Sequence, residues 1–292
     1  MNKKIFLVTG ANSGLGKGCA QLLADQGHQV LMLCRSAERG QAALEEIRQK
    51  TANPEVEVML ADLSSQVSIR SFVKAFEARF DHLHGLLNCA GIRVLDRRKN
   101  ADGLELMFGT EYLGHFLLTN LLVPALKAGR PSRVVTISGE GHKSGVEGGV
   151  GGTINFADLQ YEKKWDVLRA SKQVVLAKIL FTYELARRLE RTGVAAHTVS
   201  PRFTRTKLSG HYPWFVRWIA AWRMAQAKAV PPEVGARDVA FALTAPELEG
   251  KTGRYFVEGR EAQSSPESYD RDTARRLWEL SEVMVGQKFS WS

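Results

Sequence analysis

Cysteine is scarce in this sequence, and its positions exclude two kinds of structural framework. The 292 residues contain three cysteines, Cys19, Cys34 and Cys89. Because the number is odd and the three lie far apart in the chain, they do not form a set of disulfide pairs. None has a neighbouring cysteine or histidine at the spacing of a zinc site. We therefore expect neither a disulfide framework nor a bound metal.

Long apolar runs are also absent. No stretch reaches about 18 consecutive uncharged apolar residues, the length that indicates a membrane span. A strand pattern begins at Ile5, which leaves no room for a signal peptide before it. The sequence thus predicts a protein without a membrane span and with a cytoplasmic location.

Acidic residues are fewer than basic ones, and the excess is spread along the chain. There are 40 Lys and Arg against 31 Asp and Glu, a formal net charge of +9. A basic protein is a candidate for nucleic-acid binding. However, the densest basic run, Arg97-Arg98-Lys99, is only three residues long. This pattern favours a solvated surface, or attraction of small anionic ligands, over a nucleic-acid partner.

The sequence does contain a regular alternation of strand and helix patterns. Strands are expected at 5–8, 29–33, 56–60, 83–87, 133–137 and 194–199. Amphipathic helices are expected at about 15–25, 38–50, 66–80, 110–127 and 168–191. Buried strands that alternate with helices form a parallel sheet with helices on both faces. We therefore predict a single α/β domain over residues 1–292, whose rhythm is broken only at 139–152 and 202–231.

A glycine-rich loop, Thr9-Gly10-Ala11-Asn12-Ser13-Gly14-Leu15-Gly16, directly follows the first strand. Glycines there allow a tight turn and let backbone N–H groups approach a pyrophosphate at a helix N-terminus. Sites that prefer NAD have an acid at the end of the second strand, whereas this strand ends in Cys34-Arg35. Since arginine suits a 2′-phosphate, we predict NADP(H); the alternative is that Arg35 is a surface cation.

Three further motifs identify a family. Asp62-Leu63 follows the third strand, Asn88-Cys89-Ala90-Gly91 follows the fourth, and Leu113-Gly114-His115-Phe116-Leu117-Leu118-Thr119 lies on the next helix. With the glycine loop, over about residues 3–205, they resemble the short-chain dehydrogenase/reductase family, in its retinol dehydrogenase branch. The resemblance implies a seven-stranded Rossmann-like sheet, with Asp62 at the adenine, Asn88 along the cofactor ribose and Thr206 near the carboxamide. The cofactor-binding residues that it implies are Gly10, Asn12, Ser13, Gly14, Leu15, Gly16, Arg35, Asp62, Leu63, Asn88, Ala90, Gly91, Pro201 and Thr206.

The family's catalytic positions carry other residues in this chain. The family reduces carbonyls or oxidises alcohols with an Asn, Ser, Tyr and Lys tetrad. Aligned on the flanking segments 154–159 and 176–182, the tyrosine position is Ser171 and the lysine position is Val175. The serine position is Gly139 and the asparagine position is Glu111. Since each acid or base group is commonly worth about 10²–10⁴ in rate, we expect ordinary ketone reduction to be crippled.

Five residues are candidates for a replacement chemistry: Glu111, Ser171, Arg202, His142 and Tyr161. Glu111 is expected to project into the cleft, where burial raises its pKa and makes it a general base; the alternative is a structural carboxylate. Ser171 occupies the tyrosine position but is far less acidic than an activated phenol. Arg202 replaces the family's glycine after Pro201, where it meets an anionic or enolate-bearing substrate, obstructs the cofactor or points to solvent.

His142 and Tyr161 lie in segments that flank the expected site. His142 lies in the glycine-rich segment 139–152, a candidate closing loop, and resembles a histidine common in this branch, which favours a scaffold role. Tyr161 lies in a polar segment that would approach the cleft.

Residues 202–231 contain an aromatic and basic stretch with Trp214, Trp218 and Trp222. Tryptophans at spacings of four form a wall suited to a bulky apolar ligand, so we expect a substrate lid there. The alternative is a helix lying on a membrane surface. The resemblance also implies that the helices at 110–127 and 168–191 pair with a second subunit in a homodimer.

Three functions remain open from the sequence. The first is acid/base chemistry on a bulky carbonyl or phenolic compound of secondary metabolism, such as a cyclisation, isomerisation, dehydration or aldol-type step, with NADP(H) retained as a structural element. The second is NADPH-dependent reduction of an activated carbonyl or quinone, with water, Tyr161 or Lys172 as the proton donor. The third is a non-catalytic protein that senses NADP(H) or binds a partner.

Overall fold

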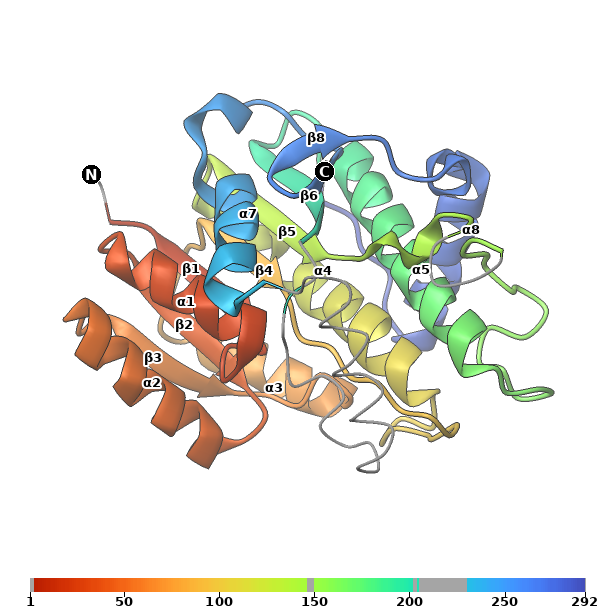
Figure 1. Cartoon of the computed structure of the whole chain (residues 1–292), viewed down its shortest axis with the longest axis horizontal. Coiled ribbons are helices and arrows are strands. Elements are labelled where there is room, and N and C mark those ends of the chain that lie inside the picture. The colour runs from red at the N-terminus through yellow and green to blue at the C-terminus, as the bar shows by residue number, and fades with distance from the viewer. Residues whose placement is uncertain (1–2, 146–149, 202–203, 205–229, 292) are drawn as a thin grey trace.

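A mostly parallel sheet with helices on both faces organises the chain (Figure 1). The computed structural model describes residues 3–145, 150–201, 204 and 230–291. The strands are β1 (Ile5–Thr9), β2 (Gln29–Cys34), β3 (Val56–Leu60), β4 (Gly85–Asn88), β5 (Ser132–Ile137), β6 (Val194–Ser200), β7 (Arg254–Val257) and β8 (Arg260–Ala262). Within the described ranges they form one sheet in the order β3-β2-β1-β4-β5-β6-β7-β8. The α/β class expected from the sequence is confirmed.

The expectation of seven strands is wrong by one. Strands β1 to β7 run parallel to one another. Strand β8 pairs antiparallel with β7 and brings the number of strands in the described ranges to eight. The two strands are joined by Glu258 and Gly259, with φ angles of 51° and 76°. Positive φ at both central residues is the signature of a two-residue hairpin turn whose twist matches that of the strands.

The α-helices in the described ranges are α1 (Gly14–Asp25), α2 (Ala37–Thr51), α3 (Gln66–Glu77), α4 (Gly114–Ala128), α5 (Val167–Arg188), α7 (Pro232–Thr244) and α8 (Arg271–Met284). The five helices predicted from the periodicity are observed within a few residues of their expected bounds, whereas α7 and α8 were not predicted. Short 3-10 turns lie at Glu140–His142, Pro246–Leu248 and Pro266–Tyr269. The helix expected to begin at 110 is preceded by a π-helical turn, η1 (Phe108–Leu113), that runs directly into α4.

Alternation along the buried strands divides the core into two layers. On β1, Leu7 packs into a layer with α3, α4, α5 and α8, whereas Phe6 and Val8 pack into a layer with α1, α2 and α7. Figure 1 shows the consequence, with α7 beside α1 and α8 alongside α5. Strand order reverses at β1, which lies between β2 and β4. In open α/β sheets, ligands bind at such a switch point, beyond the carboxyl ends of the strands.

Helix α8 packs against α4 and α5, the two helices that are expected to pair with a second subunit. The ring of Trp278 on α8 lies 4.9 Å from that of Phe116 on α4 and 5.8 Å from that of Phe181 on α5. The Tyr112 and Ser281 hydroxyl oxygens are 2.7 Å apart. These contacts fix α8 against α4 and α5 within one chain. The expectation that α4 and α5 pair with a second subunit stays a prediction.

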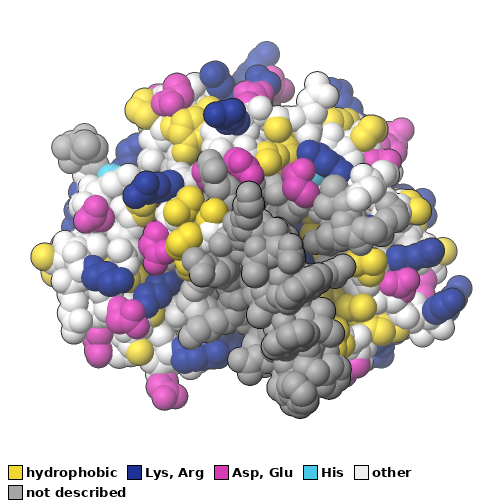
Figure 2. Space-filling model, in the orientation of Figure 1, with side chains coloured by type: hydrophobic (Ala, Val, Ile, Leu, Met, Phe, Trp, Pro, Cys, Tyr) yellow, Lys and Arg dark blue, Asp and Glu magenta, His cyan; other side chains and the backbone are white. Residues whose placement is uncertain are grey.

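The surface carries both signs of charge. Figure 2 shows Lys and Arg side chains interspersed with Asp and Glu over the visible face, as the scattered sequence pattern indicates. None of the helices in the described ranges has the length and apolar character needed to cross a bilayer.

The packing of α8 makes Trp278 a strong determinant of stability. Its side chain is 1% exposed and contacts two aromatic rings from different helices. We expect Trp278→Ala to lower the free energy of unfolding by about 3–5 kcal/mol through lost burial and the cavity left behind. Urea denaturation measures this, and Glu279→Ala at the exposed next position is the control, with a change within about 0.5 kcal/mol. Equal effects of the two substitutions would contradict this role of α8.

Candidate active site

The loops expected to hold a cofactor all lie at one edge of the sheet. The glycine loop follows β1, Arg35 follows β2, and Asp62 and Leu63 follow β3. Asn88 ends β4, residues 89–91 follow it, and Pro201 follows β6. Because these strands are parallel, their carboxyl ends meet at the same edge. The fold thus brings these segments together around the switch point.

The glycine loop has the geometry of a cradle built from backbone. Gly10 and Gly14 have φ angles of 67° and 53°, in the left-handed region that favours glycine. A Cβ on Gly16 would lie 2.6 Å from the carbonyl oxygen of Gly10, and one on Gly10 would lie 2.9 Å from Ala90 Cα. Ser13, the N-cap of α1, makes no side-chain capping bond. The first amides of α1 therefore remain available for an anion, which fits a dinucleotide pyrophosphate.

Asn88 also fits a bound ligand at this edge. Its side chain is 1% exposed, and its amide nitrogen donates to the Thr119 hydroxyl at 2.9 Å. Its Oδ1 has no hydrogen-bond partner in the described part of the chain. Since buried polar atoms in native proteins are nearly always satisfied, this oxygen suits a hydroxyl donor such as the cofactor ribose.

Thr9 connects the glycine loop to the helix that carries Glu111, a link that sequence reasoning missed. Its hydroxyl accepts from the backbone N–H groups of Cys89 and Ala90 at 2.8 and 2.9 Å. His115 Nδ1 donates to the Glu111 carbonyl at 2.9 Å, so its Nε2 accepts from the Thr9 hydroxyl at 3.0 Å. Burial lowers the pKa of His115 to about 4, which keeps this neutral tautomer in place.

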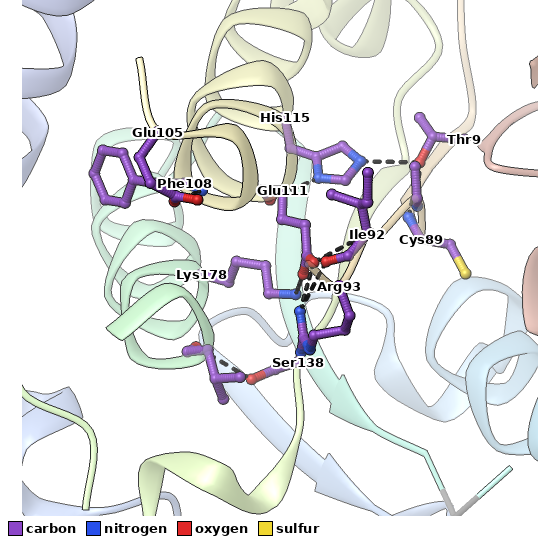
Figure 3. Close-up of polar contacts among 12 residues, drawn as sticks. Thr9, Cys89, Ile92, Arg93, Glu105, Phe108, Glu111, His115, Ser138 and Lys178 are labelled. Carbon is purple, nitrogen blue, oxygen red and sulfur yellow. Dashed lines mark hydrogen bonds and ion pairs between the residues drawn. The ribbon is translucent and has the colours of Figure 1, made fainter. Parts of the chain in front are cut away.

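Glu111 lies in the π-helical turn η1 and is surrounded by cations (Figure 3). Its Oε1 accepts from Arg93 Nη1 at 2.6 Å and from the Ile92 N–H at 3.0 Å. Its Oε2 accepts from Lys178 Nζ on α5 at 3.0 Å. Glu111 is 2% exposed and Lys178 is 7% exposed. We call Glu111, Arg93 and Lys178 the charged cluster; Arg93 and Lys178 are site residues that the sequence analysis did not single out.

The expectation that burial raises the pKa of Glu111 is wrong. Burial by itself does raise the pKa, but Arg93, Lys178 and the Ile92 N–H together outweigh it and hold the pKa below its usual range. Glu111 is therefore a stable carboxylate and a poor general base. Its role in this arrangement is to hold two cations in a buried place.

Helix α5 presents the substituted positions on one face. Ser171, Val175 and Lys178 are four and three residues apart, the spacing at which helical side chains are neighbours. The Ser138 hydroxyl donates to the Val175 carbonyl at 3.3 Å, which places the end of β5 beside this face. At the next position, Gly139, no described atom lies within 4 Å of where a Cβ would stand. No phenol occupies the position that Ser171 holds.

His142 and Tyr161 are both buried away from the charged cluster. His142 donates from Nδ1 to the Gly139 carbonyl at 2.7 Å, and burial lowers its pKa. Tyr161 is 7% exposed, has a φ of 48° and packs edge-on against Trp165. Burial raises the pKa of Tyr161, which opposes proton release from its phenol.

Other expected groups are engaged or lie outside the described residues. Lys172 is 4% exposed and donates to the Val150 carbonyl at 2.9 Å, so its ammonium has a backbone partner. Arg202, Thr206 and the tryptophans of the expected lid lie outside the described residues.

Comparison with known proteins identifies the family. The chain matches the sequence model of the short chain dehydrogenase family over residues 4–151, about half of its length. The chain belongs to this family of oxidoreductases, and the resemblance noted from its motifs is confirmed.

Its relatives include retinol dehydrogenases. It is 38% identical to retinol dehydrogenase 11 of Mus musculus over 288 residues, which are 99% of this chain and 88% of that protein. It is also 38% identical to retinol dehydrogenase 12 of Homo sapiens over 283 residues, 97% of this chain and 86% of that protein. The crystal structure of an uncharacterised protein from Mycobacterium paratuberculosis matches with a TM-score of 0.77 and 30% identity, over 99% of this chain and 95% of that chain. Since the relatives are dehydrogenases, the chain is placed among enzymes.

The charged cluster predicts a strong coupling between Glu111 and Lys178. Removing one partner of a buried ion pair costs about 3–5 kcal/mol because the other charge is left uncompensated. We expect Glu111→Leu and Lys178→Met each to destabilise the protein, and the double variant to be more stable than the sum of the two effects implies. Urea denaturation of the four proteins measures the coupling, and strict additivity would contradict it.

The same variants give a pH test with a defined sign. Because the pKa of Glu111 is lowered in the folded state, the unfolded state takes up the proton first as pH falls. The stabilisation of the folded state by ionised Glu111 is therefore complete above the ordinary glutamate pKa of about 4.3. It is lost as pH falls through the lower pKa of Glu111 in the folded state. The stability difference between the wild type and Glu111→Leu should shrink over that range.

Proposed function

We propose that the chain binds NADP(H) at the switch point and uses the neighbouring cleft for acid/base chemistry on a bulky carbonyl or phenolic metabolite. The reaction class is one that passes through an enolate or phenolate, such as an isomerisation, dehydration, cyclisation or aldol-type step. The observation that carries this proposal is the charged cluster, which holds two cations and a low-pKa carboxylate at the position where the family's asparagine is expected.

The cofactor part of the proposal rests on the glycine cradle and on Arg35. Arg35 is exposed directly after β2, and Arg39 is exposed in the first turn of α2. No acid stands at the end of β2 to bind ribose hydroxyls, and a guanidinium matches the geometry of a 2′-phosphate. When bound, the nicotinamide would supply a hydride donor or acceptor. In the alternative, structural role it would form only a wall of the proposed cleft.

The catalytic part follows from the charge of the cluster. Arg93 and Lys178 carry two positive charges against the one negative charge of Glu111, a net charge of +1. Cations fixed in a site of low dielectric stabilise a developing oxyanion without reorganising. The side chain of Arg93 is 23% exposed and so is the member of the cluster best placed to meet a substrate.

The remaining candidates take narrower roles in this proposal. Glu111 positions Arg93 and Lys178 and does not touch the substrate. Ser171, half-buried on the same face of α5 as Lys178, relays the substrate proton to solvent through its hydroxyl. Residues 202–231, with Arg202 and their tryptophans, remain the proposed lid over an apolar substrate.

Reduction of an activated carbonyl or quinone by NADPH is the second candidate. The observation that favours it is the 38% identity to retinol dehydrogenases over nearly the whole chain. In this reading the cations stabilise the oxyanion that forms after hydride transfer, and water provides the proton. The burial of Tyr161 and the backbone bond of Lys172 argue against those two as donors. We also propose that the chain forms a homodimer, in which α4 and α5 pair with a second subunit.

Cofactor binding is tested by calorimetric titration of the purified protein with NADPH and NADH. We expect tighter binding of NADPH, and we expect Arg35→Glu to weaken NADPH binding by at least about tenfold through loss of a charge-assisted bond to the 2′-phosphate. NADH binding should change little. The control is Arg48→Glu on α2, away from the end of β2; an equal loss in both variants would point to general charge instead of phosphate recognition.

Anion stabilisation is tested by hydrogen exchange into 2-tetralone, a bicyclic ketone with acidic α-protons. We expect the protein to accelerate deuterium incorporation from D2O, measured by mass spectrometry, without oxidation of added NADPH. Loss of one oxyanion-stabilising donor commonly costs about 10²–10³ in rate, so Arg93→Gln should abolish most of the acceleration.

The matched control is Arg98→Gln, because Arg98 pairs with Asp96 on the exposed part of the same loop. Stoichiometric NADPH oxidation with 2-tetralone would support the redox candidate instead. Exchange that is equally fast in Arg93→Gln and in the wild type would remove the cluster from the mechanism.

A further inference from the structure

A concave site lies at the opposite edge of the sheet from the glycine loop. Its volume is about 270 Å³, and it is lined by Glu184, Arg187, Arg188, Arg271 and Arg275. The first three end α5, which leads into the start of β6, and the last two begin α8. The amino ends of the strands lie at this edge, so the site is separate from the cofactor loops at the carboxyl ends. Along α5, Arg187 is about 14 Å from Lys178.

Two of these arginines are held in place before any ligand arrives. Glu184, with a side chain 11% exposed, accepts from Arg187 Nε at 2.9 Å and from Arg188 Nε at 2.8 Å. The guanidinium of Arg188 also lies 4.3 Å from the ring centroid of the buried Trp278. A guanidinium has five N–H donors, so Glu184 leaves most of those of Arg188 available. Less side-chain freedom is therefore lost on binding.

The site carries uncompensated positive charge. Four guanidiniums and the carboxylate of Glu184 line the pocket, and Arg275 also pairs with Asp272 at 2.7 Å. These six side chains sum to a net charge of +2. In the described part of the chain, Arg271 has no ion pair or hydrogen bond of its side chain. Asp270 already accepts from the free amides that begin α8. The guanidiniums, and not the helix terminus, thus provide the attraction for an anion.

We propose that this pocket, the arginine pocket, binds a phosphoryl-bearing anion such as a phosphate monoester or a diphosphate. Guanidinium groups pair with phosphate oxygens through two parallel hydrogen bonds. The donors come from two helices on different sides of the pocket, an arrangement that suits a tetrahedral group with oxygens in several directions better than a planar carboxylate. A charge of −2 on the ligand balances the net charge of the pocket.

Inorganic pyrophosphate is the probe, and it is titrated calorimetrically into the full chain at low ionic strength. Saturating NADPH is present so that it competes with pyrophosphate for the glycine loop. We expect the double variant Arg271→Gln/Arg275→Gln to bind at least about tenfold more weakly than the wild type, the factor that corresponds to 1.4 kcal/mol. Both residues are exposed, so the fold should persist. The control is Arg237→Gln/Arg276→Gln, which removes the same charge from exposed positions outside the pocket.

A vesicle sedimentation experiment distinguishes a free phosphorylated molecule from a lipid headgroup as the source of the phosphate. Binding of pyrophosphate without sedimentation on vesicles of phosphatidylcholine and phosphatidate indicates a free phosphorylated molecule. Sedimentation on those vesicles, absent with pure phosphatidylcholine and lost in Arg271→Gln/Arg275→Gln, indicates a lipid headgroup. Equal weakening in the test and control variants, or no pyrophosphate binding by the wild type, would overturn the proposal. Neither result bears on the charged cluster, because the two sites share no residue.

Discussion

A carboxylate that is only 2% exposed has to be compensated by positive charge, and this requirement organises the centre of the molecule. Glu111 draws Arg93 from the loop after β4 and Lys178 from α5 to its two oxygens. The loop, the π-helical turn and α5 are thereby fixed relative to one another. The Glu111 carbonyl extends the same connection through His115 to Thr9 and the glycine loop. The glycine loop and the charged cluster are thus parts of one hydrogen-bonded unit.

This arrangement separates two properties that usually occur together in the family to which the chain belongs. The scaffold for a dinucleotide is intact, because the glycines of the loop make close backbone contacts that no other residue would allow. We propose that the proton-transfer groups are different, because Ser171 and Val175 can neither ionise like a phenol nor carry charge. What the charged cluster offers in this proposal is a fixed electrostatic field. Such a field favours reactions in which negative charge develops on an oxygen.

The C-terminal part of the chain has two effects on the outer surface. Helix α8 packs its aromatic face on α4 and α5. The start of the same helix brings two arginines to the two at the end of α5. One packing event therefore buries Trp278 and creates the arginine pocket. Both effects lie at a distance from the glycine loop.

The sequence by itself determined the features that depend on local order. Periodicity placed the helices from α1 to α5 but not α7 or α8, the alternation of strands and helices defined the α/β class, and the glycine loop located the expected cofactor edge. Each of these features rests on residues that are neighbours in the chain. The turn at Glu258 and Gly259 also depends on neighbouring residues, but the sequence analysis did not predict it or the eighth strand that follows it. Tertiary structure alone decided the ionisation of Glu111. Its two cations are 18 residues before it and 67 residues after it, and a pKa depends on charges within a few ångströms and not on distance along the chain. The packing of α8 on α4 and α5 was not predicted for the same reason, because the rings that Trp278 contacts are distant from it in the sequence.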